Sequence, residues 1–161
     1  MKVKFNDTIL TDDFLRVESR ENATSFVYRQ RAVNPDINNV LSLLKEVRKL
    51  CKEKGIKVKR AGYKKQLEGY KATGEYENIV NEYNDCWEQL KKGWSKLIED
   101  GLYAPIQDNE DYLRLREVEF KMQKMHYRSS VLFQVNSIYK QLKEYKRKIE
   151  SEHCNYSFIS L

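Results

Sequence analysis

Glycine and proline are scarce in this chain, with six and two residues among 161. All-β sandwiches and barrels need many tight turns, and those turns are usually built from glycine and proline. Hydrophobic residues still make up 40% of the chain and aromatic residues 12%, which is enough for a packed core. The composition therefore argues against both a mainly β fold and a disordered chain, and it favours helices.

Residues that hold metals or form disulfides are also few. Cys51, Cys86 and Cys154 are odd in number, widely separated and free of any Cys-x-x-Cys pair, and the only histidines are His126 and His153. This spacing argues against a disulfide framework and against a zinc site. The sequence also contains no phosphate loop, dinucleotide fingerprint or nucleophile elbow. We therefore expect no metal, no cofactor and no enzymatic activity.

No run of the sequence approaches the roughly 18 to 20 apolar residues that cross a bilayer, and the first residues lack the apolar core of a signal peptide. We therefore expect a cytoplasmic protein without a membrane partner. Lysine, asparagine, tyrosine and isoleucine are abundant while alanine occurs five times, a bias typical of an AT-rich coding genome such as that of a low-GC bacterium or its phages. For a phage-encoded protein the compartment would be the host cytoplasm.

Residues 1–31 differ from the rest of the chain because they are rich in alternating, β-branched and aromatic residues, which predict two or three short strands. A sheet this small cannot stand alone, so it should pack on the helices. The side chains expected to make that contact are Phe5, Phe14, Val17, Phe26 and Tyr28.

Three helices are predicted, over residues 35–54, 75–100 and 108–151. The first follows the start signal Asn34-Pro35-Asp36 and ends before Gly55, which can adopt a left-handed cap. The second has apolar residues at alternating spacings of three and four, the pattern of a helix packed lengthwise on another: Tyr76, Val80, Tyr83, Trp87, Leu90, Trp94 and Leu97. Gly93, inside that pattern, indicates close approach of another part of the chain.

The third helix follows the capping cluster Asp108-Asn109-Glu110-Asp111, and its apolar pattern takes an irregular six-residue step from Met125 to Val131. This step predicts a change of winding or a bend. The length of residues 108–151 matches helices 35–54 and 75–100 laid end to end, so we expect 75–100 to pack on its first half and 35–54 on its second. Dimerisation through the second half is the alternative.

The sequence thus predicts a single domain over residues 1–161. Its fold class is mainly α, an antiparallel helical bundle or hairpin with one long C-terminal helix and a small N-terminal β element. Residues 55–74 form a basic connector for which a strand at 56–59 and a helix at 63–72 both remain open. The tail, residues 152–161, is strand-like and either joins the N-terminal sheet or frays.

Positive charge is concentrated in one segment, because residues 45–65 hold ten Lys and Arg against two Glu, whereas the remaining chain holds 20 basic residues against 22 acidic ones. The candidate binding residues are Lys54, Lys57, Lys59, Arg60, Tyr63, Lys64 and Lys65. Such cations neutralise phosphates, and a tyrosine among them can stack on an unpaired base. The structural alternative is a solvated helix end and loop. A second group of cations between Lys140 and Lys148 is interleaved with Glu144 and has the composition of a solvated helix face.

Long apolar seams and many charged residues favour a non-enzymatic protein-protein interaction module that binds another protein or forms a homodimer. From an AT-rich genome, such a module would suit a phage or mobile-element accessory factor that modulates a host or viral complex. The alternative is a nucleic-acid-binding protein that contacts the backbone through residues 54–65.

Overall fold

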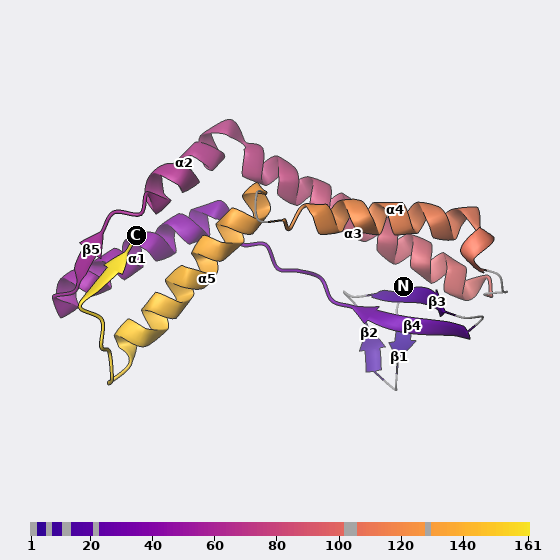
Figure 1. Cartoon of the computed structure of the whole chain (residues 1–161), viewed down its shortest axis with the longest axis horizontal. Helices are drawn as coiled ribbons and strands as arrows, with labels where there is room; N and C mark the ends of the chain where they lie inside the picture. The colour runs from indigo at the N-terminus through magenta and orange to yellow at the C-terminus, as the bar shows by residue number, and fades with distance from the viewer. Residues whose placement is uncertain (1–2, 6–7, 11–13, 21–22, 102–105, 128–129) are drawn as a thin grey trace. The chain divides into compact units, whose positions relative to one another are not determined.

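A computed structural model of the chain describes residues 3–5, 8–10, 14–20, 23–101, 106–127 and 130–161. Within these ranges the chain first forms two antiparallel hairpins, β1 (Val3–Phe5) with β2 (Thr8–Leu10) and β3 (Phe14–Arg20) with β4 (Ala23–Arg29) (Figure 1). The helices are α1 (Ile37–Lys54), α2 (Tyr63–Thr73), α3 (Glu75–Glu99), α4 (Glu110–Lys124) and α5 (Val131–Glu150), and a 3-10 turn, η1 (Ile106–Asp108), precedes α4. Strand β5 (Lys57–Lys59) pairs with β6 (Phe158–Ser160). The predicted fold class, mainly α with a minor β element, is confirmed.

The chain divides into two compact units, each made of two separate stretches of sequence. Unit 1 comprises Met1–Val33 and Asn81–Met125, and unit 2 comprises Asn34–Val80 and His126–Leu161. Helix α3 begins in unit 2 and supplies unit 1 with its residues from Asn81 onward. No helix in the described ranges is long and apolar enough to span a membrane.

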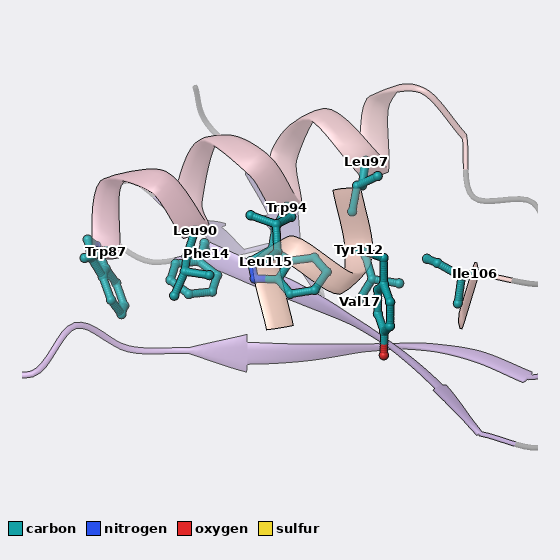
Figure 2. Close-up of a cluster of buried hydrophobic side chains, with 9 residues drawn as sticks. All are labelled: Phe14, Val17, Trp87, Leu90, Trp94, Leu97, Ile106, Tyr112 and Leu115. Atoms are coloured by element: carbon teal, nitrogen blue, oxygen red, sulfur yellow. The ribbon is translucent and has the colours of Figure 1, made fainter. Parts of the chain in front are cut away.

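The core of unit 1 lies where α3 meets β3 and α4 (Figure 2). Its buried side chains are Phe14 and Val17 of β3, Trp87, Leu90, Trp94 and Leu97 of α3, Ile106 of η1, and Tyr112 and Leu115 of α4. The rings of Phe14 and Trp87 pack with centroids 4.6 Å apart. The apolar pattern predicted for residues 75–100 is therefore a packing surface within the chain.

The prediction of packing side chains in the N-terminal strands is partly wrong. Phe14 and Val17 are buried, but Phe26 and Tyr28 on β4 remain 45% and 40% exposed. A two-stranded sheet has no interior strand, and it is β3 whose side chains enter the core with α3 and α4. The side chain of Phe5 lies outside the described residues.

Gly93 on α3 faces the side chain of Leu115 on α4, because a Cβ atom added at Gly93 would lie 2.3 Å from Cδ2 of Leu115. Leu115 is buried, so it has little room to move. We expect Gly93→Ala to lower the free energy of unfolding by about 1 kcal/mol, since overpacking costs about 1–3 kcal/mol and the gain in helix propensity returns about 1 kcal/mol.

The matched control is Gly69→Ala, because Gly69 lies in α2 with no atom within 4 Å of the added Cβ. This variant should be more stable than the unmodified chain by up to about 1 kcal/mol, from helix propensity alone. Urea denaturation followed by far-UV circular dichroism measures both changes. Equal stabilisation by the two alanines would contradict the close approach at Gly93.

The prediction of one long helix over residues 108–151 is wrong, because α4 ends at Lys124 and α5 begins at Val131. Each helix has its own N-cap: the side chain of Asn109 accepts a hydrogen bond of 3.0 Å from the Tyr112 amide, and Ser130 accepts one of 3.1 Å from the Phe133 amide. The break coincides with the six-residue step in the apolar pattern. In one continuous helix, a six-residue step would place the apolar residues before and after it on different faces. A new helix begins instead, with Ser130 as its N-cap.

In unit 2, α1 packs beside α5 (Figure 1), as predicted for residues 35–54 and the distal half of residues 108–151. The buried side chains are Val40, Leu44, Val47 and Cys51 of α1 and Leu132, Val135, Ile138, Leu142 and Ile149 of α5. The cap of α1 is Asp36, one residue before the helix, rather than Asn34, whose side chain instead accepts a hydrogen bond of 3.0 Å from Asn136. Gly55 adopts the predicted left-handed cap, with φ of 70°.

The basic connector and the tail meet in a two-stranded parallel sheet. Lys57, Val58 and Lys59 of β5 pair with Phe158, Ile159 and Ser160 of β6. Both open alternatives for residues 56–72 are therefore realised in turn, first a strand and then α2. The prediction that the tail joins the N-terminal sheet or frays is wrong, because Ile159 and Leu161 are 2% and 0% exposed and anchor the tail in unit 2.

Candidate functional site

The two units differ sharply in charge. Unit 2 contains 17 Lys and Arg residues against nine Asp and Glu, whereas unit 1 contains 13 against 15. All of the net positive charge of the chain therefore belongs to unit 2.

Helix α1 separates its cations from its apolar face. The buried face is Val40, Leu44, Val47 and Cys51. Lys45, Arg48, Lys49 and Lys52 recur at spacings of three and four, which places them together on one exposed flank of the helix. Glu46 lies elsewhere, toward α5, where it pairs with Lys146 at 2.9 Å. The flank thus carries four cations, and Glu53, one turn after Lys49, is the carboxylate at its end.

Two adjoining hollows of about 520 and 310 Å³ lie beside this flank, between α1, the end of β5 and the start of α2. They share Arg48, Lys64 and Glu68 in their linings, and we call the two hollows together the cationic groove. Its charged lining is Lys45, Arg48, Arg60, Lys64, Lys65 and Glu68, and its apolar lining is Leu41, Leu44, Val58 and Leu161. The groove is thus lined by five cationic side chains and one acidic side chain.

Only some of the predicted site residues line the groove. Arg60, Lys64 and Lys65 line it, whereas Lys54, Lys57 and Lys59 lie on exposed surface and Tyr63 is half-buried. The Nζ atom of Lys59 lies 3.7 Å from the centroid of the Phe158 ring. Lys45, Arg48 and Glu68 were missed by the sequence analysis, although the helical spacing of the α1 cations was a signal for Lys45 and Arg48.

The groove cations are largely free of internal partners. Lys64 lies 4.0 Å from Glu68, and neither Lys45, Arg48, Arg60 nor Lys65 pairs with a carboxylate in the part of the chain that the structure describes. Exposed cations without carboxylate partners raise the local positive potential, which attracts anions.

The cations of α5 have the opposite arrangement. Arg147 donates two hydrogen bonds to Glu144, of 2.8 and 3.1 Å, and Lys148 lies 3.4 Å from the same carboxylate. The hydrogen bond from Arg147 is the main reason why the pKa of Glu144 is lowered to about 2. Lys146 bridges Glu46 and Glu150 at 2.9 and 3.9 Å. Three of the five α5 cations are thus paired with carboxylates, in keeping with the solvated helix face expected from the sequence.

Neither tyrosine near the basic segment lines the groove. Burial raises the pKa of Tyr63, and the neighbouring Tyr145 of α5 adds to that rise. The hydroxyl of Tyr70 belongs to a hydrogen-bonded network with Gln66 of α2 and Gln134 of α5, in which Gln66 donates to Gln134 over 2.7 Å. Both rings thus serve contacts between α2 and α5.

Unit 1 contains one unusual charged cluster, centred on Glu119 of α4, which is 2% exposed. Its Oε1 accepts hydrogen bonds from Arg16 of β3 and, over 2.8 Å, from Arg29 of β4. Arg16 itself is 7% exposed. These hydrogen bonds join the β3–β4 hairpin to α4, while the other carboxylate oxygen, Oε2, is buried without a hydrogen-bond partner.

Among the described residues, no three His, Cys, Asp or Glu side chains lie close enough together to hold a metal ion. Comparisons of the chain with protein-family models, with curated proteins and with solved structures found no match.

Proposed function

We propose that this protein is a non-enzymatic, cytoplasmic nucleic-acid-binding protein that grips the sugar-phosphate backbone in its cationic groove. The observation that carries the proposal is a contrast within unit 2. Four of the five groove cations, which come from α1, from α2 and from the residue after β5, lack a carboxylate partner in the described chain, whereas Lys146, Arg147 and Lys148 of α5 are paired with carboxylates. Five cations distributed over two adjoining hollows match a series of phosphates better than a single small anion.

Lysines supply three of the five cations, and they act as point charges without the fixed fork of arginine. Contacts of this kind position a backbone but do not read base sequence. The proposed binding is therefore of low sequence specificity. If all five cations contact phosphates, the logarithm of the binding constant should fall against the logarithm of salt with a slope of about −3.5 to −4.5.

The test is fluorescence anisotropy with a labelled, mixed-sequence oligonucleotide at low and moderate salt, about 50 and 200 mM. We expect a groove variant with Arg48→Gln, Arg60→Gln, Lys64→Gln and Lys65→Gln to bind at least about 100-fold more weakly at the lower salt, with a shallower salt slope. All four positions are exposed, so the fold should survive. Glu68→Gln should have the opposite effect and tighten binding a few-fold, since it removes the single carboxylate of the groove.

The matched control replaces four cations of α5, with Lys140→Gln, Lys143→Gln, Arg147→Gln and Lys148→Gln. It changes the net charge of unit 2 by the same amount but leaves the groove intact. We expect this control to keep its affinity within about fivefold. Equal losses in the two variants would show that only net charge matters, and absence of binding by the unmodified protein at low salt would refute the proposal.

A second candidate is a protein-interaction module, for instance a phage or mobile-element accessory factor that docks on another protein or on itself. It is favoured by α4, where Leu113 and Phe120, two turns apart on one side of the helix, remain 49% and 54% exposed. Light-scattering mass separates the two candidates. A dimer in the free protein supports self-association, whereas a monomer that gains mass only with oligonucleotide supports the groove.

A further inference from the structure

We infer that the cationic groove takes single-stranded nucleic acid in preference to a double helix. This inference rests on the proposed function and concerns the class of nucleic acid that the same site accepts. It is carried by the concave shape of the groove, by its apolar lining and by its two unpaired guanidinium groups.

The shape is the first observation. The two hollows of about 520 and 310 Å³ have the size of pockets that enclose small molecules, which is about 300–1,000 Å³. A double helix presents its phosphates on a broad convex surface and keeps its bases paired inside, so it can lie across such hollows but cannot fill them. A single strand can turn individual nucleotides into them, and two adjoining hollows suit two consecutive nucleotides.

The apolar lining is the second observation. Val58 lies between Lys57 and Lys59 on β5, lines the larger hollow and is 44% exposed, and half-buried Leu41 lines the smaller one. Apolar surface contributes nothing to the binding of a phosphate. It does favour the burial of a base, because the flat face of a base is largely apolar and is shielded from water in such a contact. The lining therefore fits unpaired bases beside the phosphates that the cations hold.

The third observation concerns stacking. Arg48 on α1 and Arg60 after β5 both line the larger hollow, and neither guanidinium is paired with a carboxylate in the described part of the chain. A free guanidinium plane stacks on an unpaired base, as an aromatic ring does. The two arginines thus supply base contacts that do not depend on Tyr63 or Tyr70, and stacking of this kind tolerates any base.

The experiment compares a single-stranded oligonucleotide with the duplex of the same sequence, both competing for the unmodified full-length chain at the same salt. We expect the single strand to bind about tenfold more tightly or better. The informative variant is Val58→Lys, which adds a cation to the groove while removing its exposed apolar side chain. It should strengthen duplex binding but lower the ratio of single-strand to duplex affinity by about threefold or more.

Val33→Lys is the control, since Val33 is 86% exposed, lies in unit 1 and gives the same change of charge. It should leave the affinity ratio unchanged. Duplex binding as tight as single-strand binding, or a Val58→Lys variant that strengthens both equally, would overturn the inference while leaving backbone binding by the groove intact. Failure of both nucleic acids to bind at low salt would overturn the inference together with the proposed function.

Discussion

Glu119→Gln is expected to lower the free energy of unfolding by about 3 kcal/mol, the lower end of the range for breaking a buried ion pair, because Arg16 loses its buried partner and keeps only Glu18, which lies 3.3 Å away and is more exposed. Arg16, at 7% exposure, cannot reach water without moving β3 out of the core. Arg29 can regain contact with water more easily than Arg16, since 37% of its side chain is already exposed. The loss should therefore reflect mainly Arg16. Urea denaturation followed by tryptophan fluorescence measures it specifically, because both tryptophans lie in unit 1.

Two comparisons make this result interpretable. Glu117→Gln, on the exposed side of the same helix, should change stability by no more than about 0.5 kcal/mol. The double variant Arg16→Met with Glu119→Leu removes both buried charges and should recover most of the loss, since well-packed apolar residues often replace a buried ion pair without cost. A Glu119→Gln variant as stable as Glu117→Gln would contradict the buried cluster.

Ile159→Ala should cost about 2–5 kcal/mol in unit 2, the usual range for truncating a fully buried isoleucine. Ile159 is 2% exposed in β6, and its strand neighbour Val58 on β5 lines the cationic groove. Because both tryptophans lie in unit 1, the transition must be followed by far-UV circular dichroism rather than by fluorescence.

The control for this prediction is the adjacent residue in the same strand. Phe158 is 47% exposed and contacts Lys59 through its ring face, so Phe158→Ala should cost no more than about 1 kcal/mol. A tail that frayed would tolerate both substitutions alike. Equal, small effects at positions 158 and 159 would therefore exclude the docked tail.

The helices were predictable where local signals agree. The apolar spacing from Tyr76 to Leu97 and the left-handed glycine at position 55 identified α3 and the end of α1, since both signals depend only on nearby residues. The pairing of helices followed from their lengths. The sequence also showed where residues 108–151 are irregular, at the step from Met125 to Val131. It did not show that the helix ends there and a second helix begins, because α4 packs in unit 1 and α5 in unit 2.

Long-range pairings were not predictable from one sequence. Nothing local links Arg16 to Glu119, or β5 to β6, because both contacts join residues about a hundred positions apart. The cationic groove was predictable only in part. Its concentration of cations was visible between residues 45 and 65, but its members were not, because the sequence does not show how α1, β5 and α2 face one another.

The parallel pairing of β5 with β6 also fixes an order of events during synthesis. Lys57 pairs with Phe158, 101 residues later, so β5 waits for most of the chain to leave the ribosome before it has a partner. Unit 1 is complete once Met125 has emerged, whereas unit 2 needs residues up to Leu161, a delay of roughly 2–7 s at ordinary elongation rates. All of unit 1 is therefore available for folding before unit 2 is complete, and the cations of residues 45–65 have no complete groove until β6 pairs with β5.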